Sequence, residues 1–168
     1  MTGRRNGADL AGAAEELLGR ARRAGGAALA DLVNALGLLG DRSLAAPVAA
    51  VSDHPDGEVR LAVAHALCTL EDPSPAAVAA LVTLSRDPVE EVRSWATFAL
   101  GGEHLDGVDA VRDALVARID DDATDVRLEA LRGLVRRGDA RAVDAALDLA
   151  PDLSDDPFFQ SAVEGLTG

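Results

Sequence analysis

Residues 87–100 read Asp-Pro-Val-Glu-Glu-Val-Arg-Ser-Trp-Ala-Thr-Phe-Ala-Leu, and this pattern has two further copies in the chain. Glu58-Val59-Arg60 is followed by Ala66-Leu67, and Asp125-Val126-Arg127 is followed by Gly133-Leu134. The Val-Arg pairs recur after 33 and then 34 residues. A repeat of this length is typical of small units that stack on their neighbours to bury a shared core. The sequence therefore predicts a helical repeat array rather than one globular core.

Each repeat is expected to contain two helices. From each repeated Val, mostly small or apolar residues follow at spacings of three and four, as on one side of a helix. Ala and Leu, both strong helix formers, supply much of the apolar content. We therefore predict an all-α fold, a right-handed α-solenoid of about five stacked antiparallel helix pairs. Further apolar-periodic segments supply the first helix of each pair, at about 9–23, 43–52, 75–86, 107–119 and 140–150.

The whole chain, residues 1–168, is expected to form a single repeat domain, with residues 1–7 disordered. Ala28-Leu29 and Phe158-Phe159 stand where the central copies have Val-Arg. Terminal units often differ from the others because they have a neighbour on one side only. The first and last units are therefore expected to act as caps. The predicted units are about 8–40, 41–72, 73–104, 105–138 and 139–168.

Polar residues beside proline predict where helices start. Asp87 before Pro88, with Glu90 after it, has the order of an N-cap followed by a capping box. Ser74-Pro75 and Asp156-Pro157 have the same beginning. Glycines stand where helices are expected to stop and where a positive φ is useful, at Gly37, Gly40, Gly101, Gly102 and Gly138.

The composition argues against several kinds of function. The formal net charge is −13, and every basic residue is Arg. Binding to nucleic acid depends on positive surface charge, so we predict no nucleic-acid partner. The absence of Lys leaves no side chain for a Schiff base. Cys68 is the single cysteine, which excludes an internal disulfide and a cluster of cysteine metal ligands.

The sequence also lacks the signals of a metal site and of membrane insertion. His54, His65 and His104 are too scattered to suggest metal binding, so we predict no metal, no cofactor and no catalytic residues. No apolar run approaches the length of a membrane span, and the arginines near the N-terminus precede no apolar segment. We expect a cytoplasmic protein without a membrane partner, either a monomer or a weak oligomer.

The pattern Asp-Pro-x-x-Glu-Val-Arg-x-x-Ala-x-x-Ala-Leu, followed by Gly-Asp and then Ala-Val-x-x-Leu, resembles the HEAT-like repeats of the phycobilisome-lyase type. This resemblance covers residues from about 24 to 166. It is specific for the fold, since several positions agree in three copies. Such repeats occur in scaffolds, in lyase-like chaperones and in some enzymes, so the resemblance says less about function.

The resemblance implies a structural role for the repeated arginines. In HEAT-like repeats the matching Arg commonly contacts acids in adjacent turns. Here Arg60, Arg93 and Arg127 would form a column with one Arg in each unit. We expect a ladder in which these arginines pair with aspartates and stabilise the stack. The alternative is a column of arginines that binds a ligand. The acids that lie six or seven residues before an Arg are Asp53, Asp87, Asp120 and Asp121.

Part of each second helix is expected to face a concave groove, as in other solenoids of this type. Large apolar residues occur at these positions, although solubility would favour charge. An exposed apolar strip often marks a partner site, whereas the alternative is that neighbouring helices cover it. The predicted groove residues are Leu61, His65, Ser94, Thr97, Phe98, Leu128, Leu131 and Arg132.

Two residues break the expected core pattern. Trp95 aligns with Ala62 on the core stripe, so we expect it to pack in the core. The alternative for Trp95 is stacking on a ligand in the groove. Glu129 falls on the same stripe, and a buried carboxylate needs a partner. We expect Glu129 to contact an Arg of the neighbouring repeat or to line a gap reached by solvent.

A cluster of arginines lies at the end of the fourth second helix and in the turn after it. Basic residues there complement the dipole of the helix. The alternative is a local site for an anion or an acidic partner, set against an otherwise negative surface. The cluster comprises Arg132, Arg136, Arg137 and Arg141.

The leading functional hypothesis is a non-catalytic scaffold that binds a protein partner through the groove. A second hypothesis, which rests on the resemblance alone, is a chaperone or enzyme that attaches a bilin chromophore to an acceptor protein. A third is an acidic immunity or neutraliser protein for a basic partner. Activity like that of the HEAT-like alkylpurine DNA glycosylases fits the net charge of −13 poorly.

Overall fold

The computed structural model describes residues 7–166, and every regular element in this range is helical. The predicted disorder of residues 1–7 falls outside this range except for Gly7, which begins the first helix. The first helices of the pairs are α1 (Gly7–Ala24), α3 (Ala45–Ala49), α5 (Pro75–Leu84), α7 (Asp109–Val116) and α9 (Arg141–Leu153). The second helices are α2 (Gly26–Leu38), α4 (Gly57–Leu70), α6 (Glu90–Leu100), α8 (Thr124–Arg136) and α10 (Pro157–Val163). Short 3-10 helices are η1 (Arg42–Leu44), η2 (Glu103–Leu105) and η3 (Glu164–Leu166).

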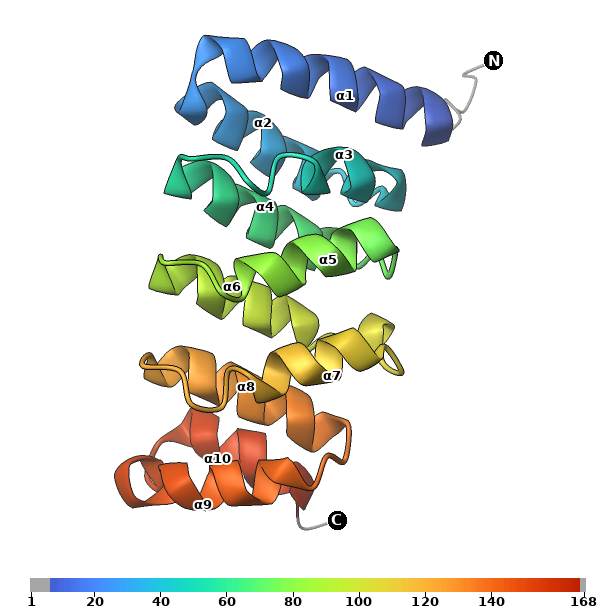
Figure 1. Cartoon of the computed structure of the whole chain (residues 1–168). Helices are drawn as coiled ribbons and strands as arrows, with labels where there is room; N and C mark the ends of the chain where they lie inside the picture. The colour runs from blue at the N-terminus through green and yellow to red at the C-terminus, as the bar shows by residue number, and fades with distance from the viewer. Residues whose placement is uncertain (1–6, 167–168) are drawn as a thin grey trace.

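The helices form two layers, as Figure 1 shows, with the N-terminal pair at one end of the stack and the C-terminal pair at the other. The second helices pack on one another in the order α2, α4, α6, α8 and α10. The first helices form the other layer, and contacts between neighbours are less extensive there. This arrangement confirms the predicted α-solenoid.

The core lies between the two layers and between successive units. Each central second helix is covered by its own first helix and by the second helices before and after it. The buried side of a second helix is therefore wider than a single stripe. In α6 it comprises Val92, Ala96, Thr97, Ala99 and Leu100. The expectation that Trp95 packs in the core is wrong, because the wider contact buries Thr97 completely and leaves Trp95 39% exposed.

Two predicted helix starts are confirmed and one is wrong. The Ser74 hydroxyl accepts a hydrogen bond from the Ala77 amide at the start of α5. The Asp156 carboxylate accepts hydrogen bonds from the Phe158 and Phe159 amides at the start of α10. Asp87 is not the N-cap of α6, which begins at Glu90 with Val89 as its N-cap. Asp87 instead accepts a hydrogen bond from the Val89 amide, 2.9 Å away.

Glycine serves two purposes in this stack. Gly40 and Gly138 have positive φ, as predicted, so they occupy a conformation that other residues rarely adopt. Gly37 has another role, because a Cβ there would lie 2.8 Å from Ala66 Cα in the adjacent helix α4. The absence of a side chain at Gly37 thus allows α2 and α4 to approach closely.

Candidate functional site

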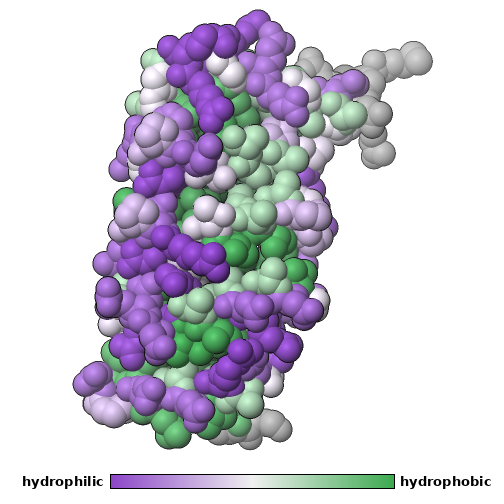
Figure 2. All heavy atoms as spheres, in the orientation of Figure 1, coloured by the Kyte–Doolittle hydropathy of each residue, from purple (hydrophilic) through white to green (hydrophobic). Residues whose placement is uncertain are grey.

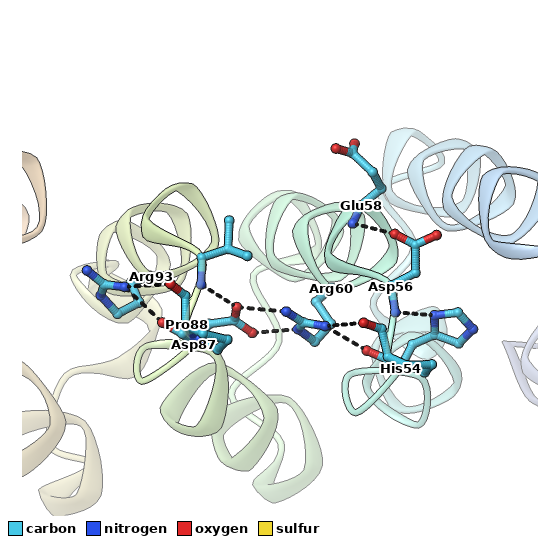
Figure 3. Close-up of polar contacts among 9 residues, drawn as sticks. His54, Asp56, Glu58, Arg60, Asp87, Pro88 and Arg93 are labelled. Atoms are coloured by element: carbon cyan, nitrogen blue, oxygen red, sulfur yellow. Dashed lines mark hydrogen bonds and ion pairs between the residues drawn. The ribbon is translucent and has the colours of Figure 1, made fainter.

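Two of the repeated arginines bind an aspartate of the following unit, and Figure 3 shows the first of these pairs, Arg60 with Asp87. Arg60 Nε and Nη2 donate to the two carboxylate oxygens of Asp87, at 2.6 and 3.0 Å. Arg93 makes the same pair of bonds to Asp121, at 3.0 and 2.9 Å. Both aspartate side chains are only 5% exposed. Burial opposes ionisation of Asp87, but the bonds from Arg60 and the Val89 amide outweigh it, so the pKa of Asp87 lies below its ordinary value.

The same arginines also bind backbone carbonyl groups of the turn before their own helix. Arg60 Nη1 donates to the carbonyl oxygens of His54 and Pro55, both at 2.9 Å. Arg93 Nη1 donates to the carbonyl oxygen of Asp87 at 2.9 Å. Each guanidinium therefore connects its own turn to the turn of the next unit.

The series of pairs stops at both ends of the array. Arg127 has no carboxylate partner among residues 7–166, and its Nε is buried without a hydrogen bond. Leu153 stands in the last unit where Asp87 and Asp121 stand in theirs. At the other end, the first unit has Ala28-Leu29 in place of Val-Arg, so it has no Arg to pair with the turn that contains His54. His54 Nδ1 accepts a hydrogen bond from the Asp56 amide, much as Asp87 accepts one from the Val89 amide. Asp53 lies in the same turn and contacts Arg22, whereas Asp120 is exposed.

Three of the predicted groove residues do not reach the surface. Thr97 and Leu131 are fully buried, and Leu128 is 5% exposed. The prediction that these three line the groove is wrong, because the neighbouring second helices cover that side of α6 and α8. Leu61, His65, Ser94 and Phe98 are half-buried, and Arg132 is exposed.

Four rings and one guanidinium form a continuous row across four second helices. The ring centroid of His65 in α4 lies 4.3 Å from that of Trp95 in α6, and the centroid of Trp95 lies 5.8 Å from that of Phe98. The rings meet edge to face at both contacts. Arg132 Cζ of α8 lies 5.1 Å from the centroid of the Phe98 ring and 5.7 Å from the centroid of the Phe158 ring of α10. We call these five residues the aromatic row, and the surface that they line the second-helix face.

A pocket of about 430 Å³ opens beside the aromatic row, over the end of α6. Ala99, Gly101 and Gly102 line the pocket, and their small or absent side chains leave space there. Cys68 and His104 line the pocket from the side of α4 and η2. Burial raises the pKa of the Cys68 thiol and lowers the pKa of His104. Cys68 is therefore held as a neutral thiol rather than as a nucleophilic thiolate.

Glu129 and Arg132 of α8 line the same pocket. Arg132 Nη1 donates a hydrogen bond to Glu129 Oε2 at 3.3 Å. The partner of Glu129 therefore comes from its own helix, whereas we expected an Arg of the neighbouring repeat. The alternative, a gap beside Glu129, is present as the pocket. Burial raises the pKa of Glu129 to about 7, against the opposing effect of Arg132.

Substitution of Glu129 should change how stability depends on pH. The folded-state pKa of about 7 lies above the ordinary value of 4.5. As pH rises from about 4.5 to 7, Glu129 ionises more readily in the unfolded chain than in the folded one. This lowers the free energy of unfolding by about 1–3 kcal/mol. Glu129→Gln removes this cost. Urea unfolding at pH 5 and pH 8 should show the variant gaining stability relative to the wild type at the higher pH, and a difference independent of pH would contradict the assignment.

The predicted arginine cluster does not form one anion site. Arg137 is buried and donates to carbonyl oxygens at the end of α6. Arg136 contacts Asp106, and Arg141 binds both carboxylate oxygens of Asp139. Arg132 belongs to the aromatic row. Arg136 and Arg137 share Asp106 as a partner. The alternative of one shared anion site is not supported, because each of these arginines is already paired within the chain.

The opposite surface of the stack offers less for recognition. Figure 2 shows pale green apolar side chains between hydrophilic margins on the side of the first helices. A shallow hollow there is lined mainly by alanines of α3 and α5, including Ala49, Ala50, Ala76 and Ala79. Small side chains provide little contact area, so the second-helix face is the stronger candidate for a binding surface.

Residues 7–166 contain neither a cluster of metal-ligating side chains nor a helix suited to cross a membrane. No group of three or more His, Cys, Asp or Glu side chains in this range is placed to hold a metal ion. No helix in the same range combines the length and the apolar character needed to cross a membrane.

Comparisons with known proteins agree on the fold. A family model for HEAT repeats matches residues 14–101 and 83–167. Protein YibA of Escherichia coli, strains K12 and O157:H7, is 37% identical over 90 residues, which cover 54% of this chain. The matched region is 31% of YibA, so this chain spans less than a third of its curated relative.

Two solved structures share the architecture at 20% identity. An engineered protein superimposes with a TM-score of 0.69, covering 91% of this chain and 77% of its own. A designed armadillo repeat protein in complex with the peptide (KR)4 gives a TM-score of 0.66, covering 93% and 82%. The family match is to HEAT repeats in general, and the phycobilisome-lyase type stays a prediction. The chain belongs to the HEAT repeat family.

Proposed function

We propose that this chain is a non-catalytic scaffold that holds a protein partner against its second-helix face. The aromatic row is the observation that carries this proposal. Trp95 and Phe158 are 39% and 40% exposed, although each could be buried at a gain in free energy. Aromatic residues and Arg are enriched at protein interfaces, where they supply most of the binding energy.

Two further observations support a binding role. The row crosses α4, α6, α8 and α10, so an extended segment lying along the stack would contact several units. The designed armadillo repeat protein, which shares the fold, is in complex with a peptide. Repeat arrays commonly use such extended surfaces for binding.

The test is affinity capture with a matched pair of variants. Phe98→Asp places a charge in the middle of the aromatic row, and Ala79→Asp places the same charge on the surface of α5. We expect Phe98→Asp to reduce the recovered partner at least about ten-fold, since a hot-spot contact contributes about 2 kcal/mol or more. Ala79→Asp should leave the recovery unchanged.

Phe98 is half-buried, so folding must be verified by thermal denaturation. Phe158→Asp provides a second variant at a more exposed site of the row. Equal recovery of the same partner by the wild type and by two folded variants of the row would refute the proposal.

A further inference from the structure

Trp95 stands at the centre of the second-helix face with an incompletely covered ring system. His65 and Phe98 approach it edge to face, and the indole remains 39% exposed. Phe98 and Arg132 occupy the next positions of the row. The exposed part of Trp95 is thus available to a ligand that lies along α6.

A hollow of about 500 Å³ lies beside Trp95, and its lining is negative. Glu90 and Glu91 come from the first turn of α6, and Asp125 comes from the first turn of α8. Val89 and Ser94 complete the lining. Carboxylates of two successive units therefore surround one exposed indole. We call this surface the Trp95 hollow.

The arginines nearby are bound to other acids, and Arg93 attracts Glu90 of the hollow without forming an ion pair with it. Arg93 is bound to Asp121, and Arg132 is bound to Glu129. Within residues 7–166 no ion pair involves Glu90, Glu91 or Asp125. The N-termini of α6 and α8 contribute roughly half a positive charge each. Three carboxylates exceed these contributions, so the hollow keeps a negative potential.

We propose that the Trp95 hollow binds an arginine or lysine side chain of a basic, extended segment of the protein partner. A cation beside an indole is attracted by the ring quadrupole, by about 0.5–2 kcal/mol depending on desolvation. The carboxylates add charge complementarity, which favours fast and specific association. Arginine should bind better than lysine, because its planar guanidinium can stack on the ring and bond two carboxylate oxygens.

The charge of the hollow disfavours other occupants. A nucleic acid could stack a base on Trp95, but its phosphates would approach three carboxylates. A purely apolar segment would use the ring and leave these carboxylates desolvated without a partner. The formal net charge of −13 adds long-range attraction for a basic segment. This inference rests on the proposed function and specifies the chemistry of the partner.

Trp95 itself provides the reporter for the test. It is the one Trp of the chain, and the chain contains no Tyr, so emission excited at long wavelength comes from the hollow. The probes are an octapeptide of alternating lysine and arginine, an octapeptide of alternating arginine and serine, and one of alternating glutamate and serine. Each is titrated into the folded 168-residue chain at low and at high salt.

The variant that tests the hollow combines Glu90→Gln, Glu91→Gln and Asp125→Asn. Its control combines Glu15→Gln, Asp144→Asn and Asp148→Asn, which remove the same charge at exposed positions of α1 and α9. We expect both basic peptides to change Trp95 emission saturably and the glutamate peptide to leave it unchanged. Affinity should fall at least about ten-fold in the hollow variant, equivalent to about 1.4 kcal/mol, and less than about two-fold in the control. Raising the salt from about 0.05 M to about 0.5 M should also weaken binding.

The outcomes separate this inference from the proposed function. If Phe98→Asp abolishes partner capture while the hollow variant and its control bind basic peptide equally, the inference is overturned and the proposed function stands. The inference is also overturned, and the proposed function stands, if basic peptide causes no emission change while capture still depends on Phe98. If capture does not depend on the aromatic row and the basic peptides give no emission change, both proposals fail.

Discussion

Arg137→Met should lower the free energy of unfolding by about 3–5 kcal/mol, the largest loss that we expect from one substitution. The Arg137 side chain is 5% exposed and lies against the end of α6. Its Nη2 donates to the carbonyl oxygens of Leu100 and Gly102, at 2.9 and 3.3 Å. Its Nη1 donates to those of Gly133 and Gly101, at 2.9 and 3.4 Å. Arg137, the C-cap residue of α8, thus supplies donors to the last carbonyl group of α6 and to the two carbonyl groups that follow it.

The Leu100 carbonyl lies in the last turn of α6, where a helix leaves four acceptors free. The Gly102 carbonyl also accepts the Leu105 amide, and the Gly101 carbonyl also accepts Arg136. Methionine has a similar length and no donor, so it would remove the hydrogen bond that the Leu100 carbonyl receives from Arg137. Urea unfolding followed by circular dichroism measures the loss. Arg20→Met is the control, since Arg20 and Glu16 form an exposed pair on α1 and should contribute about 0.5 kcal/mol or less. Equal losses in the two variants would show that the cap contributes nothing.

The second large effect concerns the Arg–Asp pairs, where the chain offers three equivalent arginines. Arg60→Met should cost about 3 kcal/mol, because it leaves Asp87 buried without its cation. Arg93→Met should cost less, since Arg118 also contacts Asp121 at 3.1 Å and would remain. Arg127→Met should cost about 1 kcal/mol or less, because Arg127 has no carboxylate partner among the described residues.

The order of these losses carries more information than their sizes. The substitution is the same at all three positions, and the positions match in the repeat, so differences in helix propensity largely cancel. Denaturant titration of the three variants should rank Arg60 above Arg93 and Arg93 above Arg127. Equal losses at the three sites would mean that the pairs with Asp87 and Asp121 do not stabilise the stack.

The repeat period made the architecture predictable from the sequence. The spacing of Val59, Val92 and Val126 located the second helices, and all three residues are fully buried. Ser74 and Asp156 marked helix starts because their side chains act within a few residues of the chain. Local rules of this kind can be read from one sequence without knowledge of the neighbours.

The face of each helix was harder to predict, because it depends on how many neighbours a helix has. A single apolar stripe describes a helix packed on one partner, whereas α6 packs against α4, α5 and α8. Thr97 and Leu131 are consequently buried, and Trp95 is exposed. The sequence did contain a signal for Trp95, since a large ring stands where another copy has Ala62. Phe158 was missed because the last unit departs from the repeat and was considered only as a cap.

Long-range polar contacts were the least predictable. Arg137 was grouped with Arg136 and Arg141 because they are close in sequence, yet three of its four acceptors are in the preceding unit. The expected Arg–Asp ladder named Asp87 and Asp121 among four acids, and only the structure shows that these two pair with the Arg of the preceding unit. Such contacts depend on the offset between stacked units, which the repeat period alone does not determine.

A protein partner is expected to bind the second-helix face, and site-specific photo-crosslinking tests this most directly. A benzophenone side chain would replace Phe98 in the aromatic row or Ala79 on α5, each in the otherwise unchanged chain. Both proteins would be irradiated with the captured partner and the covalent adduct quantified by mass. We predict an adduct from position 98 and none from position 79. An adduct from position 79 alone would contradict the account and assign binding to the first-helix layer.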